Sequence, residues 1–141
     1  MSGANPRGTG GTVANGLTLA VLVVDAVVLA VVELLFLPLR LDGYLLPYAL
    51  GGIPVPVSAL VAALTTPWLV SVAGRLSTRL LVAAAPLIGW ILAVAVFGMF
   101  GPGNDLVLVA DWRSLLLFAC GALPSAIVLG KVLATTLGPA R

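Results

Sequence analysis

Residues 17–39 read LTLAVLVVDAVVLAVVELLFLPL, an apolar run interrupted by only two carboxylates, Asp25 and Glu33. As an α-helix, this run of about 23 residues would be about 34 Å long, enough to cross the ~30 Å hydrocarbon core of a bilayer with some tilt. A secretory signal peptide would have a shorter apolar region that ends in small residues, whereas Phe36 and Pro38 stand here. We therefore expect a span that is retained in the membrane.

The composition of the whole chain agrees with this first segment. Of the 141 residues, 61% are hydrophobic and 9% are charged, whereas soluble domains carry roughly a quarter charged residues. The mean hydropathy is +1.21. A domain of this length has too much surface for its volume to bury so many apolar residues, so the excess must face lipid. The sequence predicts an integral membrane protein.

Three further apolar segments give four predicted spans, at residues 17–39, 53–72, 80–100 and 115–137. Turn-forming Gly, Pro and Asp residues in segment 40–52 separate the first two spans, and a polar hairpin at 101–114 separates the last two. Residues 1–15 offer no apolar face and are predicted to form a disordered tail, with a short tail at 139–141. The predicted fold class is an all-α membrane protein, a four-transmembrane-helix bundle over residues 16–138.

The Lys and Arg residues predict the orientation of this bundle. With four spans, one side of the membrane holds five of the seven basic residues: Arg7, Arg75, Arg79, Lys131 and Arg141. The opposite side holds only Arg40 and Arg113, together with three Asp residues. Because positively charged segments resist translocation, both termini are predicted to be cytoplasmic.

Several kinds of function are disfavoured by what the chain lacks. Histidine is absent, which removes the common zinc sites, imidazole ligation of haem and the usual general base. The net charge is only +2 and the basic residues are scattered, so no basic stripe could follow a nucleic-acid backbone. The single cysteine, Cys120, is interpreted as a small apolar filler. We expect no enzyme activity, no cofactor, no metal and no nucleic-acid partner.

Three charged side chains fall inside the predicted spans: Asp25, Glu33 and Lys131. A charge in hydrocarbon costs several kcal/mol unless it is paired, hydrated or neutralised. Eight helical positions place Asp25 and Glu33 roughly 80° apart, so both are expected to face the bundle interior. Asp25 would lie about 12 Å deep and Lys131 about 9 Å deep, which allows a pair between the first and fourth helices. Glu33 would be within reach of Arg113 or Arg40.

Other residues of the spans are expected to have packing roles. Trp90, near the middle of the third span, is expected to fill the core. The hydroxyl groups of Ser58, Thr65 and Thr66 are expected to bond to the backbone of the second span. Two pairs of small residues at four-residue spacing, Ala59 with Ala63 and Ala85 with Gly89, are candidate helix contacts.

Two functions remain open from these residues. The first is a non-enzymatic accessory or stabilising subunit of a membrane complex, with the three intramembrane charges as packing contacts and with lipid, other membrane subunits or further copies as partners. The second is a small proton-coupled transporter in which Asp25, or else Glu33, binds substrate and proton in turn. A water-accessible cavity beside Asp25 would favour transport, and a closed Asp25–Lys131 pair would favour the subunit.

Residues 75–121 contain Pro86, the pair Gly89-Trp90 and a turn of the form Pro102-Gly103-x-Asp105-Leu106. With these features the segment, about a third of the chain, resembles an uncharacterised family of small actinobacterial four-helix membrane proteins. The resemblance implies topology and origin, and no activity. A composition dominated by Ala, Val and Leu, with Arg preferred to Lys, is typical of high-GC bacteria. We expect a multi-pass protein of the bacterial inner (plasma) membrane.

Four spans with an acidic residue in the first also resemble the architecture of the small multidrug resistance transporters. In that family a membrane-embedded glutamate binds drug and proton alternately, and it would correspond here to Asp25 or Glu33. The chain departs from the family because the aromatic surroundings expected for that glutamate are missing, the N-terminal segment is longer and the second span is proline-rich. These departures put the activity in doubt.

Overall fold

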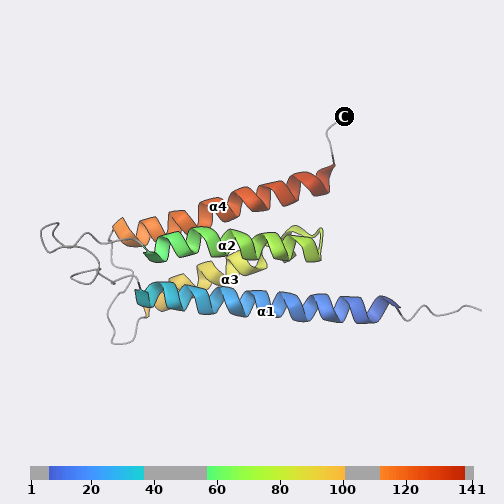
Figure 1. Ribbon diagram of the computed structural model, residues 1–141, viewed down its shortest axis with the longest axis horizontal. Helices are drawn as coiled ribbons and strands as arrows, with labels where there is room; N and C mark the ends of the chain where they lie inside the picture. Colours follow the sequence, from blue (N-terminus) through green and yellow to red (C-terminus); the bar gives the residue numbers. More distant parts are fainter. Residues whose placement is uncertain (1–6, 37–56, 101–111, 139–141) are drawn as a thin grey trace, which may run out of the picture.

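The computed structural model describes residues 7–36, 57–100 and 112–138, which form four α-helices (Figure 1). Helix α1 spans Arg7–Phe36, α2 Val57–Leu76, α3 Leu80–Met99 and α4 Trp112–Leu137. All four are long and apolar enough to cross a membrane. No strand occurs among these residues, so the predicted all-α class with four helices is confirmed.

The helices alternate in direction, so that α1 begins and α4 ends at the same end of the bundle, beside the turn between α2 and α3 (Figure 1). Helix α1 packs against α2 and α3, and α4 packs mainly against α2. Within the described ranges, α1 and α4 do not contact each other. The middle layer of α2 and α3 therefore separates the first helix of the chain from the last.

The third helix agrees with the predicted span 80–100 to within one residue, whereas the second differs at its end. Residues 53–56 of the predicted second span lie outside the described residues. Helix α2 continues through Pro67 to Leu76, past the predicted end at residue 72. The turn to α3 is correspondingly short, and in it the backbone N–H of Arg79 donates to the hydroxyl oxygen of Ser77 at 3.2 Å. Arg75 thus lies in the last turn of α2 rather than in a loop.

The start of α1 differs from the prediction. The helix begins at Arg7, so residues 7–15 are helical and the prediction of a disordered tail is wrong for them. The prediction relied on the lack of apolar side chains, but two side-chain hydrogen bonds fix the end of this segment that adjoins the apolar run. The side-chain amide of Asn15 donates to the carbonyl oxygen of Leu76 on α2 at 3.5 Å, and the Thr18 hydroxyl donates to the carbonyl oxygen of Ala14 at 2.8 Å.

The start of α4 differs as well, because the helix begins at Trp112, inside the predicted hairpin 101–114. The remainder of that hairpin, residues 1–6, segment 40–52 with Arg40, and the tail 139–141 lie outside the described residues.

Small residues let the helices approach closely around one large aromatic side chain. Trp90 on α3 has no exposed surface, which confirms its predicted place in the core. A Cβ atom on Gly89 would lie 3.2 Å from a methyl carbon of Val23 on α1, so Gly89 belongs to a helix contact as expected. On α4, Gly121 faces the six-membered ring of Trp90, and a Cβ atom there would overlap that ring. Only hydrogen fits as a side chain at position 121.

We predict that Gly121→Ala lowers the free energy of unfolding by about 1–3 kcal/mol, because the added methyl group forces Trp90 or α4 to move. The matched control is Gly16→Ala, at a helical glycine where an added Cβ would meet no atom within 4 Å. This control should be neutral or slightly stabilising, since Ala favours helix over Gly. Thermal unfolding of the purified proteins measures both changes. Equal melting temperatures for Gly121→Ala and the wild type would contradict the close contact.

Candidate functional site

Glu33, in the last turn of α1, is the one charged side chain that the described part of the chain buries, with 1% of its surface exposed. Its carboxylate is bound by two other helices. The indole Nε1–H of Trp90 on α3 donates to Oε2 at 2.7 Å, and the Thr65 hydroxyl on α2 lies 3.4 Å from Oε1. A buried carboxylate needs such donors, because leaving it unsatisfied is costly.

Trp90 is the stronger of these two partners. The Thr65 hydroxyl also lies 2.8 Å from the carbonyl oxygen of Val61, and its single proton cannot serve both acceptors. The shorter distance shows that the bond to Val61 is the better one, which confirms the predicted backbone bond of Thr65. The same expectation is wrong for Thr66, whose buried hydroxyl has no hydrogen-bond partner among the described residues.

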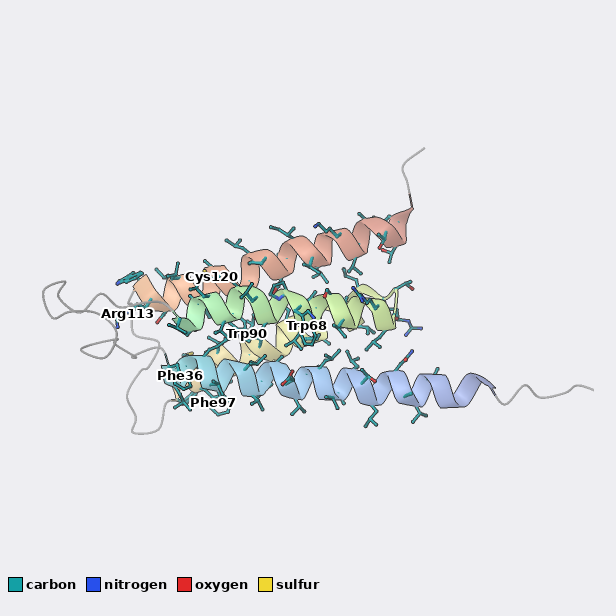
Figure 2. All side chains as sticks on the ribbon, viewed as in Figure 1. Phe36, Trp68, Trp90, Phe97, Arg113 and Cys120 are labelled. Carbon is teal, nitrogen blue, oxygen red and sulfur yellow. The ribbon has the colours of Figure 1, made fainter. Side chains whose placement is uncertain are left out.

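The ring of Trp90 extends this contact to the fourth helix. It meets Gly121 of α4 and packs edge to face against Phe118, with ring centroids 5.8 Å apart and planes at 65°. Figure 2 shows Trp90 on α3 inside the bundle, between the ribbons of α1 and α2. The Glu33–Trp90 hydrogen bond therefore links α1 to α4 although these helices do not contact each other directly. With Thr65, residues from all four helices meet at this place.

Asp25 does not face the interior. It is exposed, whereas the buried stripe of α1 passes through Leu22, Ala26, Ala30 and Glu33. The rotation of roughly 80° between the two carboxylates is enough to move Asp25 to the outer face. The expectation that both carboxylates point inward is thus right for Glu33 and wrong for Asp25.

Two of the expected ion pairs are not formed between the described residues. Lys131 is exposed on α4, and because α1 and α4 do not contact each other in the described ranges, the predicted pair between Asp25 and Lys131 is wrong for a single copy. The Glu33 carboxylate accepts its short hydrogen bond from Trp90, and the Thr65 hydroxyl is a more distant neighbour. A neutral indole donor thus takes the place of the expected cation of Arg113. The other expected partner, Arg40, lies outside the described residues.

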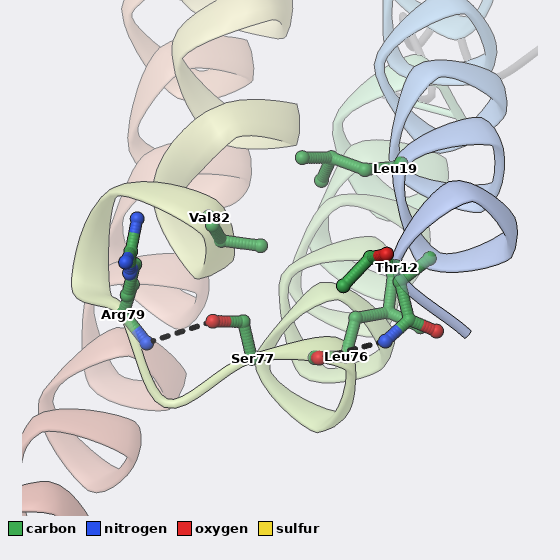
Figure 3. Close-up of a pocket in the computed structure, with 8 residues that line it drawn as sticks. Thr12, Leu19, Leu76, Ser77, Arg79 and Val82 are labelled. Carbon is green, nitrogen blue, oxygen red and sulfur yellow. Dashed lines mark hydrogen bonds between the residues drawn. The ribbon is translucent and has the colours of Figure 1, made fainter. Parts of the chain in front are cut away.

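An open recess lies at the end of the bundle where α1 begins (Figure 3). It has a volume of about 390 Å³ and is lined by Thr12, Asn15, Gly16, Leu19, Leu76, Ser77, Arg79 and Val82. Two hydrogen bonds already use part of its polar lining, one from Asn15 to Leu76 and one from the backbone of Arg79 to Ser77. Asp25 is not part of the lining.

The Glu33 site has the chemistry of a structural contact. A lone carboxylate that accepts bonds from neutral donors supplies neither an acid–base pair nor a set of metal ligands. Within the described residues, no three His, Cys, Asp or Glu side chains come together. Cys120, a free thiol on α4, is half-buried.

No known family, curated protein or solved structure matches the chain. The resemblances to the actinobacterial four-helix family and to the small multidrug resistance transporters therefore stay predictions.

We predict that Trp90→Phe lowers the free energy of unfolding by about 1–3 kcal/mol or more, because it removes the main donor to a buried carboxylate and leaves a small void. The same change should cost clearly less in a Glu33→Leu background, where no carboxylate is left unsatisfied. Thermal unfolding of the wild type, the two single variants and the double variant gives the coupling free energy.

The control for this cycle is Glu33→Gln, which keeps an oxygen acceptor for the indole N–H and should be better tolerated than Glu33→Leu alone. A coupling free energy indistinguishable from zero would show that Glu33 and Trp90 do not stabilise each other.

Proposed function

We propose that this chain is a multi-pass protein of the bacterial plasma membrane that acts as a non-enzymatic accessory or stabilising subunit of a membrane assembly. The observation that carries the proposal is the outward position of Asp25 on α1 and of Lys131 on α4. A charge on a lipid-facing surface costs several kcal/mol unless it is paired. An oppositely charged residue of a neighbouring subunit would supply the missing partner.

Membrane insertion is supported by the outer surfaces of the four helices. Each helix exposes large apolar side chains, among them Val21, Val28, Leu60, Leu64, Leu81, Leu92, Leu115 and Ile127. Helices that are apolar on the outside as well as the inside fit lipid and not water. All four have the length that a hydrocarbon core requires.

Cytoplasmic termini are supported by where the basic residues lie along the helices. Arg75 and Arg79 flank the turn between α2 and α3, and this turn lies at the end of the bundle where α1 begins and α4 ends. Arg113, in the first turn of α4, lies at the opposite end. The excess of positive charge favours the first of these ends as the cytoplasmic one.

The contact around Glu33 supports a stable scaffold more than a transport cycle. A transporter binds its substrate in a cavity that opens in turn to each side, whereas the Glu33 carboxylate is enclosed and hydrogen-bonded to Trp90. Transport through Asp25, the alternative function, would need a site outside the single bundle, because this side chain faces outward. For the subunit role, a single copy needs only a rigid core and an outer surface that can contact a neighbour.

The proposed orientation predicts how fused reporters behave. Green fluorescent protein fused after Arg141 should fluoresce, and alkaline phosphatase fused at the same place should be inactive, because both report a cytoplasmic location. Phosphatase fused after Met99, where α3 reaches the opposite end, should be active. An active phosphatase at the C-terminus would contradict the orientation.

The proposed role predicts that the protein extracted in a mild detergent belongs to a particle larger than one chain of 14.3 kDa. Light scattering that separates protein from detergent mass gives the size, and mass spectrometry identifies the components. Purification of a single copy without any companion would overturn the role as a subunit.

A further inference from the structure

Asp25 and Lys131 lie at similar levels of the bundle. The Trp90 ring provides the reference level, because it contacts Glu33 on α1 and Gly121 on α4. From Glu33, Asp25 is eight residues toward the start of α1, or about 12 Å; from Gly121, Lys131 is ten residues toward the end of α4, or about 15 Å. Both directions lead to the same end of the bundle (Figure 1). Two opposite charges thus stand at nearly equal depth on helices that do not meet in one copy.

The outer surface of α4 around Lys131 allows a second helix to approach closely. Ala126, Gly130 and Ala134 recur at every fourth position and are all exposed. A Cβ atom on Gly130 would meet nothing within 4 Å, so the absence of a side chain there serves no contact inside the bundle. Small residues at this spacing let a second helix approach closely in a membrane. Lys131 borders this stripe of small residues.

The outer surface of α1 around Asp25 is complementary to it. Val21, Val24 and Val28 are exposed beside Asp25 and form a ridge of stiff, branched side chains. A ridge of valines with one negative charge fits a shallow groove of small residues with one positive charge. Copies inserted in the same orientation present these two surfaces to each other at matching depth.

We propose that the occupant of each surface is a second copy of this chain, with Asp25 on α1 of one copy paired to Lys131 on α4 of the next. The inference rests on the proposed membrane assembly and names its partner. Because α2 and α3 separate α1 from α4, the two surfaces lie on different sides of one copy, and the contact is head to tail. A closed ring leaves no Asp25 or Lys131 unpaired.

Gly130→Leu tests the contact without disturbing the single bundle, since the position is empty in one copy. The assembly of the wild type should be lost in this variant. Gly10→Leu is the matched control, because an added Cβ there also meets nothing within 4 Å and the position lies about 22 Å from Asp25 along α1. It should assemble as the wild type does. Light scattering in mild detergent gives the number of copies, and circular dichroism checks that the helices are retained.

Charge exchange tests the pairing of Asp25 with Lys131. Asp25→Lys and Lys131→Asp, each expressed alone, place like charges across the contact and should yield single copies. Co-expressed with different tags, the two variants should purify together, because the new lysine of one meets the new aspartate of the other. Lys131→Arg, which keeps the charge, should assemble normally, and so should Arg79→Met, which removes an exposed cation at the end of the bundle.

The outcomes separate this inference from the proposed function. Assembly that survives Gly130→Leu and both charge reversals overturns the proposed contact but leaves an assembly. A single copy of the wild type that purifies with other membrane proteins also overturns the contact and leaves the subunit role. A single wild-type copy without companions overturns both.

Discussion

The hydrogen bond from the Trp90 indole to the buried Glu33 carboxylate constrains the rest of the bundle. Enclosing a carboxylate in an apolar core requires a donor at bonding distance, and the indole N–H supplies it at 2.7 Å. The other edge of the same ring reaches α4, where position 121 must be glycine to leave room for it. One side chain thus fixes the spacing of two helices that never contact each other directly in the described ranges.

The two carboxylates of α1 have opposite environments because they project from different faces of the helix. Glu33 shares the buried stripe of α1 with Ala26 and Ala30, while Asp25 is turned away to the outer face. The inward carboxylate is satisfied within the chain and contributes to its rigidity. The outward carboxylate is not part of that core, and Lys131, its proposed partner in a second copy, stands at a similar depth on the far side of the bundle. The stability of the bundle therefore depends on Glu33, whereas the proposed association between copies depends on Asp25.

Apolar runs and turn residues were enough to predict four helices, and the central place of Trp90 followed from its position in the third run. Which face of α1 points inward could not be predicted, because a helix that is apolar all round has no polar side to mark the exterior. The partner of Glu33 was missed for a different reason. A search for opposite charges leads to Arg113 or Arg40, whereas the structure uses a neutral donor. A tryptophan in mid-span was the available signal, since its N–H needs an acceptor when buried.

The separation of 57 residues between Glu33 and Trp90 has a consequence for synthesis. The ribosome completes the first helix well before the third exists, so the nascent chain holds this carboxylate without its indole donor for the time needed to make two more helices. Neither α1 nor the α1–α2 hairpin can reach its final packing by itself. The packing around Glu33 must therefore wait for α3.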